Sequence, residues 1–161
     1  GYGNNGAAFA RLLQPFNVRV LAYDKYKQDF SDGYIEEASI ESIKEHADVI
    51  SLHIPLTPET YHLINHDFFS ACKKHFYFIN ACRGGVTDTK AVIDALVNQR
   101  IRGAALDVLE NEQISTYNTA EKEQFDFLCN HPHVIITPHI AGYSHEAFKK
   151  MTDILLSKIN C

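Results

Sequence analysis

The chain has 161 residues, enough for one domain with a sizeable hydrophobic core and too few for two ordinary domains. Hydrophobic residues make up 45% of it and charged residues 22%, the balance of a soluble globular protein. The net charge of −5 argues against a nucleic-acid partner, because neutralising phosphates needs clustered Lys and Arg. No apolar stretch approaches the ~20 residues that cross a bilayer, so we expect no membrane partner. Since no C-x-x-C pair is present, we expect free thiols, a cytoplasmic location and no metal site; the cysteines are Cys72, Cys82, Cys129 and Cys161.

Short apolar segments alternate with helical patterns along the chain. These segments are nearly apolar throughout, which is typical of parallel strands covered on both faces. The predicted strands are residues 17–24, 48–54, 75–81, 103–108 and 133–140. The predicted helices are residues 6–14, 39–46, 89–99, 119–129 and 143–160. This alternation predicts an α/β fold with a doubly wound parallel sheet of the Rossmann type.

The chain opens with GYGNNG, a G-x-G-x-x-G pattern that runs directly into an apolar helical segment. In a dinucleotide fold the first glycine makes the tight turn and the second lets the backbone approach a pyrophosphate. The third glycine allows the helix to pack closely on a strand. Free N–H groups at the helix N-terminus then bind the phosphates. We therefore predict that a dinucleotide binds at Gly1, Gly3, Asn4, Asn5 and Gly6.

An acidic residue strengthens this interpretation. Asp24 ends the next predicted strand, 18 residues after Gly6, close to where a ribose-binding acid belongs. A carboxylate there accepts hydrogen bonds from ribose hydroxyls and repels a 2′-phosphate, so it favours NAD over NADP. Lys25 and Lys27 lie close by and weaken that preference slightly. The alternative is a structural glycine turn beside a surface carboxylate.

Three further motifs stand at the carboxyl ends of predicted strands, where open α/β sheets bind their ligands. Together they offer an Arg, carboxylates and a His, the set that proton and hydride transfer at a carbonyl or alcohol requires. His exchanges a hydroxyl proton near neutral pH, a neighbouring Glu orients the imidazole, and Arg binds a carboxylate through two hydrogen bonds. For the His, a core imidazole bonded to backbone is the alternative. The motifs are INACRGG (79–85), ALDVLENE (105–112) and TPHIAG (137–142).

With these motifs the chain resembles the cofactor domain of the D-isomer-specific 2-hydroxyacid dehydrogenases, the family of D-lactate and 3-phosphoglycerate dehydrogenases. The resemblance runs from Gly1 to about Gly142 and includes SLHIPLTPET (51–60), with all motifs in the family's order. It implies that residues 1–161 are the NAD-binding domain of a two-domain enzyme. That enzyme would interconvert a D-2-hydroxy acid and a 2-oxo acid, and would pair as a homodimer through this domain.

The resemblance also implies roles for residues at matching positions. Arg83 would bind the substrate carboxylate and carbonyl, Glu112 would be the acid of the proton relay, and His139 the general acid and base. Glu110 is a rival acid, but the family places its acid five residues after the strand-end Asp, here Asp107. Beyond the glycine turn and Asp24, the implied NAD contacts are His53, Pro55, Ala81, Cys82, Arg83, Asp107, His139 and Gly142.

Some expectations concern what surrounds these motifs. Such a glycine turn is fed by a buried strand, so we expect that strand, and the substrate domain, to belong to a longer polypeptide. Two other classes of function stay open: a corepressor-like NAD-binding module that acts through protein contacts, and a dimerisation module without turnover. A sugar or alcohol dehydrogenase would need a Tyr–Lys pair or a metal site, and neither is found in register. We expect His62 and His66 to be solvated in a loop, before a helix that starts near Asp67.

Overall fold

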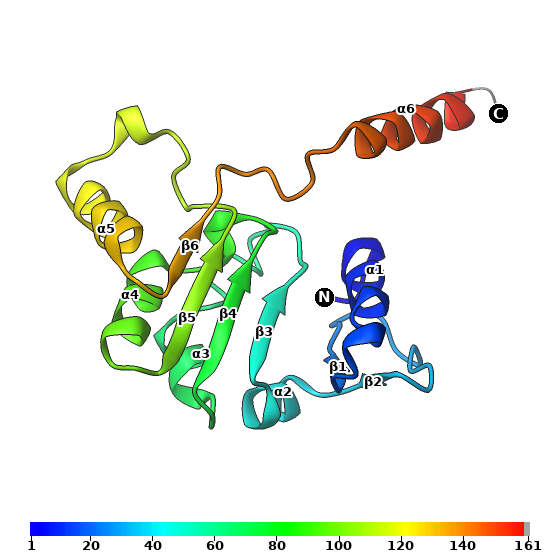
Figure 1. Ribbon diagram of the computed structural model, residues 1–161, viewed down its shortest axis with the longest axis horizontal. Helices are drawn as coiled ribbons and strands as arrows, with labels where there is room; N and C mark the ends of the chain where they lie inside the picture. The colour runs from blue at the N-terminus through cyan, green and yellow to red at the C-terminus, as the bar shows by residue number, and fades with distance from the viewer. Residues whose placement is uncertain (160–161) are drawn as a thin grey trace.

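The computed structural model of the protein describes residues 1–159 and contains two parallel sheets (Figure 1). A two-stranded sheet has the order β1-β2, and a four-stranded sheet has the order β3-β4-β5-β6. The strands are β1 (Val20–Ala22), β2 (Ile35–Glu37), β3 (Val49–Leu52), β4 (Phe76–Asn80), β5 (Ile101–Leu106) and β6 (Val134–Ile136). Every pair of neighbouring strands is parallel, so the carboxyl ends of the strands in each sheet meet at one edge.

Helices connect the strands, as the predicted alternation requires. The helices are α1 (Asn4–Leu12), α2 (Ile40–His46), α3 (His66–Ala71), α4 (Thr89–Val97), α5 (Thr119–Asn130) and α6 (His145–Ile159). The short 3-10 turns are η1 (Gln14–Phe16), η2 (Gly84–Val86) and η3 (Ile114–Thr116). The predicted fold class, α/β with a parallel sheet of the Rossmann type, is therefore confirmed. The predicted end of the last helix at residue 160, and Cys161, lie outside the described residues.

Side-chain caps explain where three helices begin. Ser39 accepts a backbone hydrogen bond at the start of α2, and Asp88 does the same for α4. Asn118 and Glu121 form a capping box at the start of α5. Each cap satisfies N–H groups that have no partner within the helix. These caps are local, which is why all three helices begin within one residue of the predicted positions.

Some elements differ from the prediction. β2 was not predicted, because its three residues Ile-Glu-Glu have one buried side chain and form no apolar run. The strand predicted over 133–140 ends at Ile136, because His139 has φ 54°, in the left-handed region that breaks an extended strand. The helix start predicted near Asp67 is confirmed by α3.

The main hydrophobic core lies between the four-stranded sheet and the helices α3, α4 and α5. Phe78 of β4 and Val92 of α4 are almost completely buried in it. A smaller core joins α1 to the two-stranded sheet through Ala7, Val20 and Ile35. The two cores hold the glycine turn and the four-stranded sheet in separate, internally packed units.

The other face of the four-stranded sheet is open within residues 1–159. Val49, Tyr77 and Ile135 share this face, and between 49% and 66% of each is exposed. We predicted strands covered on both faces, and the structure covers only one. No residue of α6 is buried, and this helix stands away from the sheet (Figure 1). Among the described helices, none has both the length and the apolar character needed to cross a bilayer.

Candidate active site

The glycine turn lies between the carboxyl ends of β1 and β3. The nitrogen of Gly1 donates to the carbonyl oxygen of Tyr23, 2.8 Å away and just after β1. On the other side, a Cβ added at Gly1 would lie 2.5 Å from the carbonyl oxygen of His53, just after β3. From this point the strand order runs outward in both directions, from β1 to β2 and from β3 to β6. The turn therefore marks the topological switch point, where open α/β sheets bind ligands.

The geometry of this turn fits a pyrophosphate. A Cβ at Gly6 would lie 2.2 Å from the carbonyl oxygen of Gly1, so only glycine allows this close contact. A Cβ at Gly3 would meet no atom within 4 Å, so the backbone there is open to an approaching group. The helix α1 begins at Asn4 with no side-chain cap and no acidic residue in its first turn. Its first N–H groups are thus left for an anionic ligand, such as the predicted dinucleotide.

Asp24 is held beside the glycine turn by backbone hydrogen bonds. Its carboxylate accepts from the N–H of Tyr2 at 2.8 Å, from Tyr26 at 2.9 Å and from Lys27 at 3.1 Å. Burial raises the pKa of Asp24, but these hydrogen bonds outweigh it and keep the pKa below its usual value. Because carboxylate oxygens have further lone pairs, Asp24 can still accept bonds from ribose hydroxyls as an anion.

His53 and Pro55 lie on the β3 side of the glycine turn. The Nε2 atom of His53 is 3.0 Å from Ser51 Oγ, and its ring centroid is 5.2 Å from that of Phe9. Burial lowers the pKa of His53, which favours a neutral imidazole. Pro55 is exposed, and its carbonyl oxygen accepts from the Thr60 hydroxyl at 2.7 Å. Both residues follow β3 directly, on the side where Gly1 approaches the carbonyl oxygen of His53, and their contact with a cofactor stays a prediction.

His139 and Glu112 meet at the carboxyl edge of the four-stranded sheet. The Nδ1 atom of His139 lies 3.0 Å from a carboxylate oxygen of Glu112, and 46% of each side chain is exposed. The rival acid, Glu110, is turned to other partners: His62 Nε2 at 2.5 Å and the N–H of Thr89 at 2.8 Å. The structure thus brings the predicted acid, and not its rival, to His139. His62 lies in a loop with 33% of its side chain exposed to solvent, and its pairing with Glu110 is a contact that the sequence did not predict.

Asp107, just after β5, accepts hydrogen bonds from the turn that carries His139 and so holds this turn in place. Its carboxylate accepts from the Thr137 hydroxyl at 2.5 Å and from the N–H groups of Ile140 and Ala141, both at 2.9 Å. Its carbonyl oxygen accepts from the N–H of His139 at 2.8 Å. Burial raises the pKa of Asp107, but the bonds to its carboxylate outweigh it, so the pKa lies below its usual value. The buried anion therefore stabilises the left-handed backbone of His139.

Arg83 stands in the exposed loop after β4. One guanidinium N–H donates to the Cys82 carbonyl oxygen at 2.5 Å. Within residues 1–159, no hydrogen bond joins Arg83 to Glu112 or His139. The loop is held from below by Asn80, which accepts from the N–H of Cys82 at 3.0 Å and donates to the carbonyl oxygen of Arg83 at 3.1 Å.

Asn80 is a functional-site residue that the sequence analysis did not single out. It is 1% exposed and also donates to Thr87 Oγ1 at 3.2 Å. The sequence contained a sign of this role, because Asn80 is a polar residue at the end of the otherwise apolar strand β4. The same loop touches the segment after β5: a Cβ at Gly84 would lie 1.8 Å from the carbonyl oxygen of Leu109. This contact brings the Arg83 loop against the segment that leads to Glu112.

The remaining predicted cofactor contacts are small residues. Ala81 and Gly142 are exposed, and a Cβ at Gly142 would meet no atom within 4 Å. Cys82 is half-buried, and its Sγ lies 3.1 Å from Asn80 Oδ1. Small side chains at these strand ends leave room for a ligand at the rim.

The other thiols and histidines do not form a site in the described residues. Cys72 and Cys129 are free, as Cys82 is, in agreement with the predicted thiols. The side chain of His66 is 51% exposed, as predicted, but His66 is the first residue of α3 and its Nε2 lies 2.7 Å from Asp94 Oδ2. No group of three potential metal ligands occurs in residues 1–159.

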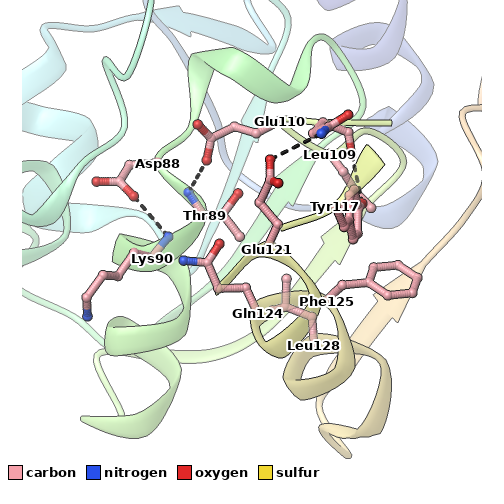
Figure 2. Close-up of a pocket in the computed structure, with 11 residues that line it drawn as sticks. Asp88, Thr89, Lys90, Leu109, Glu110, Tyr117, Glu121, Gln124, Phe125 and Leu128 are labelled. Atoms are coloured by element: carbon pink, nitrogen blue, oxygen red, sulfur yellow. Dashed lines mark hydrogen bonds between the residues drawn. The ribbon is translucent and has the colours of Figure 1, made fainter. Parts of the chain in front are cut away.

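A separate cavity lies between α4, α5 and the segment after β5 (Figure 2). Its volume is about 250 Å³. Its carboxylates are already engaged: Glu110 accepts from the N–H of Thr89, and Glu121 accepts from Asn111 at 3.1 Å (Figure 2). This cavity is therefore a gap between two helices. The candidate site consists of the glycine turn with Asp24, and of the rim, the carboxyl edge of the four-stranded sheet with Arg83, Glu112 and His139.

Comparison with known proteins identifies the family of the chain. Residues 1–141 match the model of the D-isomer specific 2-hydroxyacid dehydrogenase, NAD binding domain. The chain is 38% identical over 159 residues to a D-lactate dehydrogenase of Streptococcus agalactiae serotype V, covering 95% of this chain and 48% of the relative. It is 38% identical over 157 residues to a glyoxylate reductase of Thermofilum pendens, covering 96% of this chain and 44% of the relative.

A solved structure gives the same result in three dimensions. The D-lactate dehydrogenase of Aquifex aeolicus, complexed with NAD and lactic acid, superposes with a TM-score of 0.87 at 32% identity. The match covers 99% of this chain and 50% of that chain. The chain therefore belongs to the D-isomer specific 2-hydroxyacid dehydrogenase family, which confirms the predicted resemblance, and its cofactor is NAD. It spans about half the length of the relatives it matches.

Proposed function

We propose that residues 1–161 form the NAD-binding domain of a two-domain dehydrogenase that interconverts a D-2-hydroxy acid and a 2-oxo acid. The 3.0 Å contact between His139 Nδ1 and Glu112 carries this proposal. A His oriented by a carboxylate is the acid–base pair needed to exchange a hydroxyl proton near neutral pH. The names of the relatives, D-lactate dehydrogenase and glyoxylate reductase, support small 2-oxo acids such as pyruvate and glyoxylate as substrates.

Each residue of the site has a role that its contacts support. NAD, when bound, accepts a hydride from the hydroxyl carbon or, as NADH, returns it. Glu112 engages Nδ1 of His139, so Nε2 is the ring nitrogen left to take or donate the oxygen proton. Arg83 uses one N–H on a carbonyl oxygen, and its other donors can hold a carboxylate through two parallel bonds.

Asp107 acts chiefly as a positioning residue in this proposal. Both of its carboxylate oxygens are engaged by the turn that carries His139, at distances of 2.5 to 2.9 Å. The resemblance also implies that Asp107 lies near the nicotinamide, and its place at the strand end beside His139 is compatible with that contact. Its main contribution is the fixed orientation of the acid–base residue.

The test is NADH oxidation by the complete polypeptide that carries this chain, with 2-oxo acids beginning with pyruvate and glyoxylate. We expect turnover, and we expect His139→Gln to lower kcat at least about 100-fold while NADH binding is kept. A complete protein that binds NADH but oxidises it with no 2-oxo acid would contradict the enzyme, and would favour the corepressor-like module. Full activity of His139→Gln would contradict the assigned role.

We also propose that the protein forms a homodimer through this domain and resides in the cytoplasm. The exposed apolar face with Val49, Tyr77 and Ile135 supports self-association, because contiguous surfaces of this kind mark interaction sites. The free thiols support a reducing compartment. Light scattering of the complete polypeptide decides the first point, since a monomeric mass at all concentrations would contradict a dimer.

A further inference from the structure

Two lysines stand next to the ribose-binding acid, yet both are engaged elsewhere. Lys25 directly follows Asp24, and its Nζ lies 3.0 Å from Glu59 Oε2. The Nζ of Lys27 lies 4.9 Å from the centroid of the Tyr2 ring, over its face. A free cation beside the ribose acid is what the 2′-phosphate of NADP would need. The structure thus holds a possible phosphate ligand, Lys25, in an ion pair.

Glu59 reaches Lys25 from the β3 side of the glycine turn. It lies in the turn after β3, whereas Lys25 lies after β1. The turn is fixed by Thr60, whose hydroxyl donates to the Pro55 carbonyl oxygen at 2.7 Å and accepts from the N–H of Thr57 at 2.8 Å. Glu59 therefore presents its carboxylate from a defined backbone.

Glu59 is also kept in its charged form. Its Oε2 accepts from the Tyr26 hydroxyl at 2.5 Å as well as from Lys25. The hydrogen bonds from Tyr26 and Lys25 lower the pKa of Glu59 below its usual value. Two carboxylates, Asp24 and Glu59, then stand with two ammonium groups, Lys25 and Lys27, beside the glycine turn, and the local charge is zero.

We propose that Glu59 is a specificity-determining residue for the cofactor, because it holds the Lys25 ammonium and so leaves the site unfavourable for a 2′-phosphate. This inference rests on the proposed NAD-binding function and deepens it. With Glu59 in place, the Lys25 ammonium is held in an ion pair, and a 2′-phosphate on the ribose meets no net positive charge. Without the Glu59 carboxylate, the local charge becomes +1 and Lys25 can turn to the phosphate. The ribose hydroxyls of NAD depend on Asp24 alone and are insensitive to this change.

The test compares the affinities of the complete polypeptide that carries this chain for NADH and NADPH, measured by titration of nicotinamide fluorescence. We expect Glu59→Gln to tighten NADPH binding about fivefold and to change NADH binding less than about twofold. Adding Lys25→Gln to this variant should remove the gain. The matched control is Glu36→Gln, which breaks another exposed ion pair. Glu36 of β2 lies 2.8 Å from Arg19, which precedes β1 at the end of the strand opposite Asp24. The control should change neither affinity.

The outcomes separate this inference from simpler accounts. If Glu59 only links two loops, Glu59→Gln weakens NADH and NADPH binding alike, and the inference is overturned. Unchanged NADPH affinity in a variant that still binds NADH overturns it as well, without touching the proposed function. Absence of NADH binding by the unsubstituted complete polypeptide contradicts the proposed function itself, and this inference with it.

Discussion

The glycine turn and the rim around His139 are built in different ways. The turn consists of six consecutive residues, and its shape depends on glycines at three of them and on contacts with the segments after β1 and β3. The rim depends on contacts between segments far apart in the chain. His139 and Glu112 are 27 residues apart, and Asp107 reaches 34 residues to Ala141.

This difference has a consequence for substitutions. In the turn, the backbone at Gly3 is open, so we expect a change there to alter binding more than folding. At the rim, the same atoms that position His139 and Arg83 also join loops of the fold. Changes there should therefore affect stability first, except where the residue is exposed to solvent.

The largest effect is expected at Gly84. Its added Cβ would lie 1.8 Å from the backbone oxygen of Leu109, so Gly84→Ala forces two loops of the rim apart. We expect a loss of about 3 kcal/mol in the free energy of unfolding, measured by urea denaturation.

Gly3→Ala is the matched control, because a Cβ at Gly3 meets no atom within 4 Å. It should cost less than about 1 kcal/mol of stability and yet weaken NADH binding at least about tenfold, since the methyl group occupies the approach of the pyrophosphate. Equal losses of stability in the two variants would contradict the proposed difference between turn and rim.

Asp107→Asn should have an intermediate effect that depends on pH. Replacing an anion that accepts three hydrogen bonds is expected to cost about 2 kcal/mol of unfolding free energy at pH 7. The pKa of Asp107 is lower in the folded than in the unfolded chain, so its stabilisation is complete above the unfolded pKa, about 4. It is lost as the pH falls through the lower folded pKa.

The stability gap between the unsubstituted chain and Asp107→Asn should therefore narrow below about pH 4. Urea denaturation at several pH values measures it. A gap of constant size down to pH 2 would mean that Asp107 does not act as a buried anion.

The smallest effect on stability is expected for Glu112→Gln. The side chains of Glu112 and His139 are each 46% exposed, and exposed pairs contribute little to folding. We expect a change below about 0.5 kcal/mol in the chain, but at least a tenfold loss of kcat in the complete polypeptide. A stability loss as large as that of Asp107→Asn would show that this pair is structural.

The sequence predicted features that depend on neighbouring residues. Ser39, Asp88 and the helices that they cap are examples, because each cap bonds to a backbone group two or three residues away. The sequence did not predict β2, because its three residues form no apolar run. The strand forms through its hydrogen bonds to β1. His62 and Glu110 are 48 residues apart in the chain, so no local sequence pattern predicts their contact.

The sequence by itself determined the α/β alternation, the glycine turn and the choice of residue types for the site. These depend on periodicity, capping and backbone freedom, which act over a few residues. Only the tertiary structure decided that Glu110 pairs with His62, that Asp107 and Asn80 hold the loops that carry His139 and Arg83, and that Glu59 binds Lys25. Those choices depend on how parallel strands bring distant segments to one edge, and the free energy of such contacts appears only when the chain is packed.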